Sequence, residues 1–127
     1  MYTTYIIGRR SYLSKNLKKE VKGSKIISVR EILNNKRNVL KEKKINIIYN
    51  HSYPLAKINS CKDYGKILNE NIVLLKNLFD FFFKNKIVIN KLIFSSSSAV
   101  YGLKKNFKDF DINDNNRTLY GVSKFLS

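Results

Sequence analysis

The sequence contains a single cysteine, Cys61, so the chain cannot form an internal disulfide, and this fits a reducing compartment. One proline and five glycines exclude a collagen-like or linker-like chain. There is no apolar run of about 18 residues, so no membrane-spanning helix is expected. The N-terminus lacks the basic segment, apolar run and small-residue cleavage site of a signal peptide. We therefore expect a cytoplasmic protein without a membrane partner.

Acidic side chains are also scarce, with 9 Asp and Glu against 25 Lys and Arg, for a formal net charge of +16. Such a charge can attract nucleic acid through its phosphates. The lysines are, however, scattered through every segment instead of clustering on one element, as they usually do in nucleic-acid readers. An AT-rich coding bias accounts for the abundance of Lys, Asn and Ile. We expect no specific nucleic-acid partner.

Short apolar segments alternate along the chain with longer amphipathic ones. Helices are predicted at residues 12–22, 64–84 and 119–126, and strands at 2–8, 25–30, 45–49 and 91–96. Leu13, Leu17 and Val21 form the apolar face of the first helix, and Ser11 is its candidate N-cap. Segment 31–44 is polar and is predicted as helix or loop. The alternation predicts the α/β class, with a parallel sheet flanked by helices.

A glycine ends the first predicted strand, and a helix follows it closely. The turn reads Gly8-Arg-Arg-Ser11-Tyr-Leu-Ser14. Backbone N–H groups and the helix dipole make such a helix start an anion site, into which a pyrophosphate would fit. On its own, one glycine before a helix is a common feature of proteins with many functions.

Two further groups of polar residues lie later in the chain. Residues 95–102, Ser-Ser-Ser-Ser-Ala-Val-Tyr-Gly, follow the last predicted strand, where ligands of parallel sheets bind. Tyr120 and Lys124 share one face of a helix because they are separated by one helical turn. A nearby cation lowers the pKa of a phenol, so this pair can relay a proton. Taken singly, each group is equally compatible with a polar loop or a chance pairing.

Together and in this order, the three groups resemble the extended short-chain dehydrogenase/reductase family of NAD(P)-dependent epimerases and dehydratases. The segments Ser-Ser-Ser-Ala-Val-Tyr-Gly and Tyr-Gly-Val-Ser-Lys match the family closely, and the resemblance covers nearly the whole chain. It implies a Rossmann-type fold in which residues 1–127 form one NAD(P)-binding domain. It also implies hydride transfer on a nucleotide-linked sugar by an epimerase, dehydratase or reductase. Association into a homo-oligomer is left open.

The resemblance also implies roles for individual residues. Ser97 takes the place of the active-site Ser/Thr, with Ser98 as the alternative, and Tyr120 takes that of the catalytic acid/base. Lys124 is then the residue that binds the nicotinamide ribose and lowers the pKa of the tyrosine. The expected cofactor-binding residues are Gly8, Arg10, Ser11, Tyr12, Leu13, Arg30, Asn71, Tyr120 and Lys124.

Asn71 is included because a polar side chain on the apolar face of helix 64–84 needs a partner. The family often has an asparagine on this helix near the active site. A hydrogen bond from Asn71 to a neighbouring loop is the alternative. No spacing of Cys, His and Asp indicates a metal site, and His51 is expected to be a loop residue.

The sequence departs from the family pattern at the turn and after the second strand. The family turn reads Gly-x-x-Gly-x-x-Gly, and Ser11 and Ser14 replace its later glycines, which predicts weakened cofactor binding. Arg30 stands near the place where the family often has Asp. With Arg9 and Arg10 it could meet a 2′-phosphate, so NADP is slightly favoured over NAD. One strand of the usual sheet is expected to be missing between the second and third predicted strands.

Family members continue well past the end of this sequence, into a C-terminal region that binds the sugar nucleotide. We therefore expect a C-terminally truncated form without the substrate domain and with little or no turnover of its own. A non-catalytic, decayed fragment that keeps only cofactor-binding features is the main alternative. A basic nucleic-acid-binding module is the less favoured one.

Overall fold

The computed structural model describes residues 2–34, 39–52, 64–97 and 123–124. The chain divides into two compact units. The first comprises Met1–Ser52 and Leu74–Ser95, and the second comprises Tyr53–Val73 and Ser96–Ser127. No helix in these described stretches is long and apolar enough to cross a membrane.

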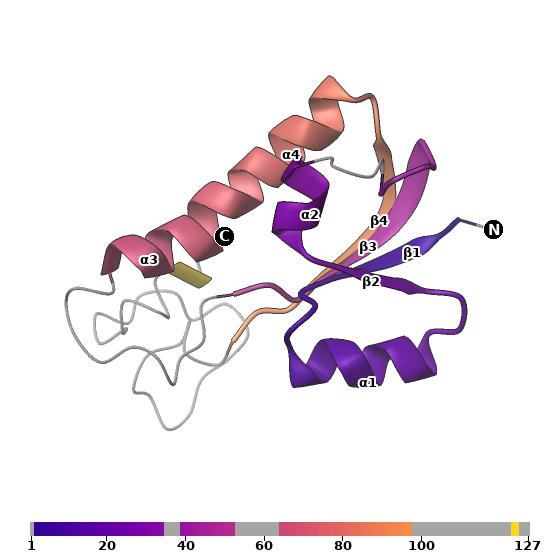
Figure 1. Ribbon diagram of the computed structural model, residues 1–127, viewed down its shortest axis with the longest axis horizontal. Coiled ribbons are helices and arrows are strands. Elements are labelled where there is room, and N and C mark those ends of the chain that lie inside the picture. Colours follow the sequence, from indigo (N-terminus) through magenta and orange to yellow (C-terminus); the bar gives the residue numbers. More distant parts are fainter. Residues whose placement is uncertain (1, 35–38, 53–63, 98–122, 125–127) are drawn as a thin grey trace, which may run out of the picture. The chain divides into compact units, whose positions relative to one another are not determined.

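The first unit is built on four parallel strands in the order β2-β1-β3-β4. These strands are β1 (Thr4–Ile7), β2 (Lys25–Ile27), β3 (Lys44–Tyr49) and β4 (Val88–Phe94). Helix α1 (Tyr12–Glu20) covers one face of the sheet, and α2 (Val29–Asn34) and α4 (Leu74–Lys84) cover the other (Figure 1). The predicted α/β fold with a Rossmann-type parallel sheet is confirmed.

The core lies between the sheet and helices α2 and α4. Strand residues alternate between the two faces, so every second side chain of β1 and β3 points to this core. The β-branched and aromatic side chains suit a buried parallel sheet. The cluster consists of Tyr5, Ile7, Ile27, Val29, Ile32, Ile45, Ile47, Tyr49, Leu74, Leu75, Leu78 and Phe82.

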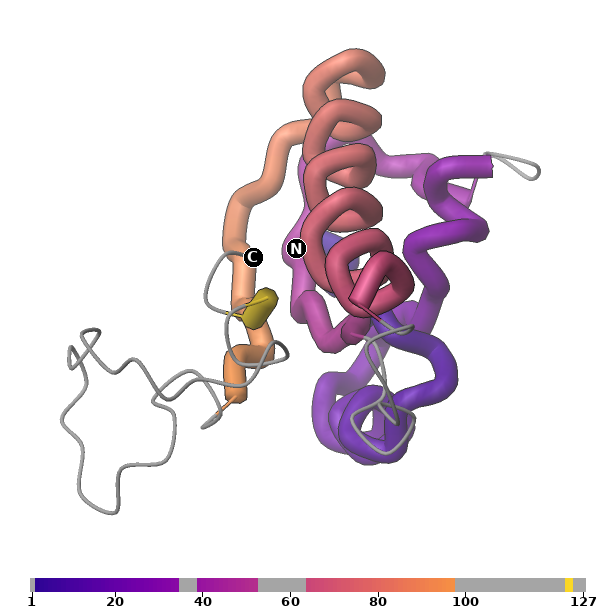
Figure 2. The backbone as a smooth tube through the Cα atoms, turned by 90° about the vertical axis from the view of Figure 1, so that its left-hand side faces the viewer, coloured from indigo at the N-terminus to yellow at the C-terminus, as the bar shows by residue number. Residues whose placement is uncertain are grey.

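Several predicted strand boundaries differ from the observed ones, most of all in the second and the last strand. The second strand was expected to extend to residue 30, but β2 ends at Ile27 because Ser28 caps helix α2. The last strand begins at Val88 instead of residue 91, and an irregularity opposite Ile45 and Asn46 interrupts its pairing with β3. Within the described residues β4 is an edge strand (Figure 2), and its side chains Val88, Leu92 and Ile93 are exposed.

Helix α1 also differs from its predicted apolar pattern. Ser11 is its N-cap, as predicted, and accepts a hydrogen bond from the backbone N–H of Ser14. Leu13 was expected on the buried face, but it is exposed, and Ser14 is the buried residue of the helix. The small serine fits where the helix start packs closely on the sheet, and a leucine one position earlier points elsewhere.

In the second unit, the described helical residues include α3 (Tyr64–Leu68) and the π-helical segment η3 (Asn69–Val73). Sequence periodicity predicted one helix over 64–84, and the structure has the consecutive segments α3, η3 and α4 there. Segments of π-helix are rare and often occur at functional sites. Ser123 and Lys124 are helical as well and are buried.

The strand order fixes where a ligand can enter the first unit. From β1 the chain passes by α1 to β2 on one side, and it then crosses by α2 to β3 on the other side of β1. The crevice between the carboxyl ends of β1 and β3 is therefore the topological switch point, where open α/β sheets bind their ligands. Gly8 follows β1 and Asn50 follows β3, so both residues lie at this point.

Glu42 anchors the opposite end of the sheet through several polar contacts. Its carboxylate accepts hydrogen bonds from the Tyr5 hydroxyl at 2.5 Å and from Thr3 Oγ1 at 2.9 Å. Lys25 Nζ lies 3.2 Å from Glu42 Oε1. The hydrogen bond from Tyr5 is the main cause that lowers the pKa of Glu42 to about 2. Burial, together with this same bond, raises the pKa of Tyr5.

We predict that this carboxylate makes the fold sensitive to acid. Its pKa is about 2 in the folded chain against 4.5 for an unperturbed Glu. The stabilisation is therefore complete above pH ~4.5 and is lost as the pH falls towards ~2. In thermal melts between pH 6 and pH 2, Glu42→Gln should remove much of the acid-dependent fall in Tm. Glu20→Gln, on the exposed end of α1, is the control and should keep it. An equally steep fall in Glu42→Gln would contradict the prediction.

Candidate functional site

The turn after β1 brings the backbone of Gly8 against the backbone of Asn50. Gly8 has φ +133°, which side chains of L-residues rarely allow, and a Cβ on it would lie 2.6 Å from the Asn50 carbonyl oxygen. The Gly8 N–H donates to the Ile27 carbonyl oxygen at 2.9 Å, and the Asn50 N–H donates to the Ile7 carbonyl oxygen at 2.8 Å. Only glycine fits a chain so closely packed between two neighbouring strands.

Some backbone N–H groups in the first turn of α1 form hydrogen bonds within the turn itself. The N–H of Ser11 donates to the Gly8 carbonyl oxygen at 3.1 Å, and the N–H of Ser14 donates to the Ser11 hydroxyl at 3.4 Å. The N–H groups of Tyr12 and Leu13 have no intrahelical acceptor, because the first turn of a helix has none. These two amides point to the start of the helix, where the helix dipole favours negative charge, and they are the turn's candidate donors to an anion.

The predicted cofactor residues of this turn therefore lie together on one short segment. Arg10, Tyr12 and Leu13 have exposed side chains. Tyr12 and Leu13 can contribute through their amides, whatever their side chains are, and Arg10 can contribute through its charge. A cation next to a helix N-terminus adds to its attraction for an anion.

Asn50 is a site residue that the sequence interpretation missed. Its amide nitrogen donates to Ser11 Oγ at 2.7 Å and to Ser14 Oγ at 3.0 Å. Both serines stand where the family has glycine, so the side chain of Asn50 bonds to both departures from the motif. No local pattern could have revealed this, because Asn50 and Ser11 are 39 residues apart.

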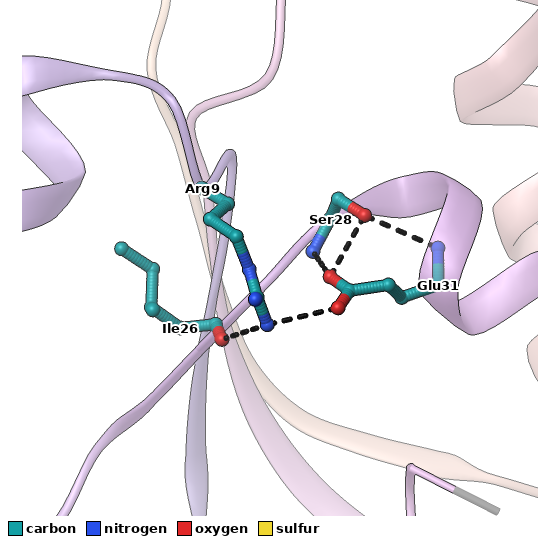
Figure 3. A network of polar contacts seen from close by, with 4 residues as sticks. All are labelled: Arg9, Ile26, Ser28 and Glu31. Atoms are coloured by element: carbon teal, nitrogen blue, oxygen red, sulfur yellow. Dashed lines mark hydrogen bonds and ion pairs between the residues drawn. The ribbon is translucent and has the colours of Figure 1, made fainter. Parts of the chain in front are cut away.

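A second polar network surrounds the carboxyl end of β2 (Figure 3). Glu31 Oε2 accepts from the N–H and the hydroxyl of Ser28, both at 2.9 Å, while the Glu31 N–H donates to Ser28 Oγ at 3.2 Å. This reciprocal pattern is a capping box at the start of α2. Arg9 Nη2 lies 2.9 Å from Glu31 Oε1 and 3.4 Å from the Ile26 carbonyl oxygen.

The residue predicted to bind cofactor at the end of β2 lies elsewhere in the structure. Arg30 was predicted at the strand end, but it lies on α2 and is exposed. The acidic side chain near the end of β2 is Glu31, whose carboxylate the capping box holds beside Ser28. The spacing Ser28-x-x-Glu31 is a sequence signature of a helix start and could have revealed this arrangement.

In the second unit, Asn71 has the buried polar contact expected of it. Its amide nitrogen donates to Ser123 Oγ at 2.8 Å, and both residues are buried. Ser123 precedes Lys124, which is also buried, and burial lowers the pKa of the Lys124 ammonium. Asn71 is thus hydrogen-bonded to Ser123, the serine of the Tyr-Gly-Val-Ser-Lys motif.

Of the predicted catalytic residues, the structure describes Ser97 and Lys124. Ser97 is half-buried, and Lys124 lies in the second unit with Asn71. Tyr120 and the alternative Ser98 lie outside the described residues. Among the residues that are described, no group of three or more His, Cys, Asp or Glu side chains could hold a metal ion.

The family model for the NAD dependent epimerase/dehydratase family matches residues 2–127. The chain belongs to this family. No curated protein matches the sequence.

Several solved structures share the fold at low sequence identity. RMD from Pseudomonas aeruginosa, complexed with NADPH, has a TM-score of 0.74 at 17% identity, and the match covers 98% of this chain and 46% of that chain. A short-chain dehydrogenase/reductase superfamily protein from Agrobacterium tumefaciens with bound NAD has a TM-score of 0.71 at 11% identity, covering 98% and 42%. UDP-glucuronic acid 4-epimerase from Bacillus cereus in complex with NAD has a TM-score of 0.60 at 22% identity, covering 98% and 41%. The chain thus spans less than half the length of each.

We predict that Gly8→Ala destabilises the fold far more than the same change at Gly23. Gly23 also has a positive φ, of +73°, but a Cβ there meets nothing within 4 Å. Backbone strain alone should cost about 1 kcal/mol at Gly23, whereas strain and the clash with Asn50 should together cost about 3 kcal/mol or more at Gly8. Urea unfolding of the two variants measures the difference. Equal losses would show that the turn can relax away from Asn50.

Proposed function

We propose that this chain is the dinucleotide-binding part of an NAD(P)-dependent epimerase/dehydratase that acts on a nucleotide sugar by hydride transfer. The carrying observation is the contact between Gly8 and Asn50 at the switch point of the sheet, where the chain turns into helix α1. The family of the chain supports the same conclusion.

The residues of the turn fit a dinucleotide. A glycine whose Cβ would strike the next strand leaves no side chain over the crevice, so the backbone can come close to a pyrophosphate. The amides of Tyr12 and Leu13 would bind the phosphate oxygens, and the exposed Arg10 would add positive charge. These donors at the start of α1 support a pyrophosphate site there.

The catalytic proposal assigns one task to each of three residues. When bound, the nicotinamide ring accepts and returns a hydride. Tyr120 would take the proton from the reacting hydroxyl, and Ser97 would hydrogen-bond its oxygen. Lys124 would bind the nicotinamide ribose and favour the phenolate of Tyr120. The burial of Lys124 supports this role, because a charge acts more strongly where it is poorly solvated.

The proposal is tested first by binding and then by chemistry. Titration of the purified chain with NADH or NADPH should show saturable binding, and the lack of it in a folded sample would contradict the proposal. For chemistry, the chain is joined to the C-terminal half of a relative and assayed on nucleotide sugars. Tyr120→Phe should then abolish turnover and leave dinucleotide binding intact. Binding without turnover in every such fusion would favour a non-catalytic, cofactor-binding protein.

The choice between NAD and NADP should depend on the charges near the end of β2. The sequence predicts that Arg9, Arg10 and Arg30 favour the 2′-phosphate of NADP. The carboxylate of Glu31 would repel a 2′-phosphate and could accept a hydrogen bond from a ribose hydroxyl. Glu31 Oε1 lies 2.9 Å from Arg9 Nη2, so a group that favours NADP and a group that favours NAD lie side by side. We propose a slight preference for NADP that Glu31 limits.

We predict that Glu31→Gln increases the preference for NADPH about fivefold. Glutamine keeps the capping box but removes the charge, and a unit charge near a 2′-phosphate at a protein surface is worth about 1 kcal/mol. Arg30→Asp should shift the preference towards NADH. The ratio of dissociation constants is the measurement, and Glu20→Gln, with the same change in charge on α1, should leave it unchanged. An unchanged ratio in Glu31→Gln would place the 2′-position away from Glu31.

A further inference from the structure

Asn50 contacts all three positions of the Gly-x-x-Gly-x-x-Gly pattern, two of which are serine in this chain. Its carbonyl oxygen lies against Gly8, where it would be 2.6 Å from a Cβ. Its side-chain nitrogen donates to Ser11 Oγ at 2.7 Å and to Ser14 Oγ at 3.0 Å. One residue at the end of β3 thus contacts the turn at positions 8, 11 and 14.

The two serines need this partner because each adds a CH2OH group, with its polar hydroxyl, where the glycine of the motif has only a hydrogen. Ser14 is fully buried against the sheet, and a buried hydroxyl without a hydrogen bond is costly. The hydroxyl of Ser11 accepts from both Asn50 and the Ser14 N–H, so two bonds hold it in a single position. An amide nitrogen has two hydrogens, and Asn50 uses one for each serine.

Fixing Ser11 has a direct consequence for the anion-binding amides. A serine side chain has three staggered rotamers, and at an N-cap its oxygen can bond to different N–H groups of the first turn. Held by Asn50, the Ser11 hydroxyl takes only the N–H of Ser14. The amides of Tyr12 and Leu13 stay available for an external anion.

We propose that Asn50 is a positioning residue for the pyrophosphate of the dinucleotide. Glycines at positions 11 and 14 would leave the turn free of side chains, and here the hydrogen bonds from Asn50 hold the two serine side chains in place instead. The inference rests on the proposed function. Asn50 acts through Ser11 and Ser14 and need not touch the ligand. Its effect therefore exists only while the two serines are present, which separates this role from a general contribution to stability.

The experiment measures binding of ADP-ribose, which contains the pyrophosphate, and of adenosine, which lacks it, by equilibrium dialysis with the full 127-residue chain. Asn50→Ala should weaken ADP-ribose binding about tenfold and change adenosine binding less than twofold. Asn46→Ala is the matched control. Asn46 lies near the other end of β3, and its side-chain amide also forms two hydrogen bonds: it donates to Thr4 Oγ1 and accepts from the Asn90 amide. This control should lower Tm without weakening ADP-ribose binding.

The decisive comparison repeats the change without the serines. In the double variant Ser11→Gly/Ser14→Gly, adding Asn50→Ala should alter ADP-ribose affinity less than twofold. Equal effects of Asn50→Ala with and without the serines would overturn the positioning role. So would equal weakening of adenosine and ADP-ribose, or an unchanged affinity for both.

The same set of variants covers the remaining outcomes. If Asn50→Ala alone does not fold, the double and triple variants are compared with each other, and a difference in their ADP-ribose affinity overturns the inference. If the unaltered chain is folded and binds no ADP-ribose, the proposed function fails and the positioning role fails with it. Binding by the unaltered chain that Asn50→Ala leaves intact refutes only the role of Asn50.

Discussion

The close approach of Gly8 to the backbone of Asn50 is the constraint on which the site depends. It joins the ends of β1 and β3 across the switch point, where the Asn50 N–H also bonds to Ile7. Because no side chain fits between them, the turn can lead directly into α1 and place the N-terminus of that helix at the crevice. The position of the first amides of α1 therefore follows from a contact between the ends of two strands that are far apart in sequence.

Polar side chains link the carboxyl ends of β1, β2 and β3 to one another and to the helices that follow them. Asn50 connects β3 to the start of α1, and Arg9 connects the turn after β1 to Glu31 on α2. The side chains of Arg9 and Glu31 are partly exposed, so their ion pair costs less desolvation than it would in the core. Charges held at such an edge can select between ligands that differ by one phosphate, which gives the Arg9–Glu31 pair its proposed role.

In the second unit, Asn71 likewise links two segments through a side-chain hydrogen bond. A π-helical segment carries this residue, and its amide bonds to the serine of the Tyr-Gly-Val-Ser-Lys motif. The motif therefore has a buried polar partner on another helix, in addition to the tyrosine and lysine that define it. Such a buried hydrogen bond fixes the position of Ser123 more specifically than apolar contacts would.

Local patterns were sufficient to predict the element order and the turn, but not the strand ends. Alternating apolar segments gave the parallel sheet, and Gly8 and Ser11 marked the helix start correctly. The second strand was predicted to reach residue 30, but Val29 and Arg30 belong to α2. The capping box of Ser28 and Glu31 favours the helix there, since it satisfies the N–H groups of a helix start.

By itself, the sequence determined the fold class, the helix start after Gly8 and the family to which the chain belongs, because these depend on residues close together in the chain. Only the tertiary structure decided how Ser11 and Ser14 are accommodated, which carboxylate lies at the end of β2, and which residue Asn71 contacts. Each of these depends on side chains that meet across the fold, such as Asn71 and Ser123, 52 residues apart. Hydrogen bonds of this kind leave no periodic signal, since strand pairing and helix packing alone bring their partners within reach.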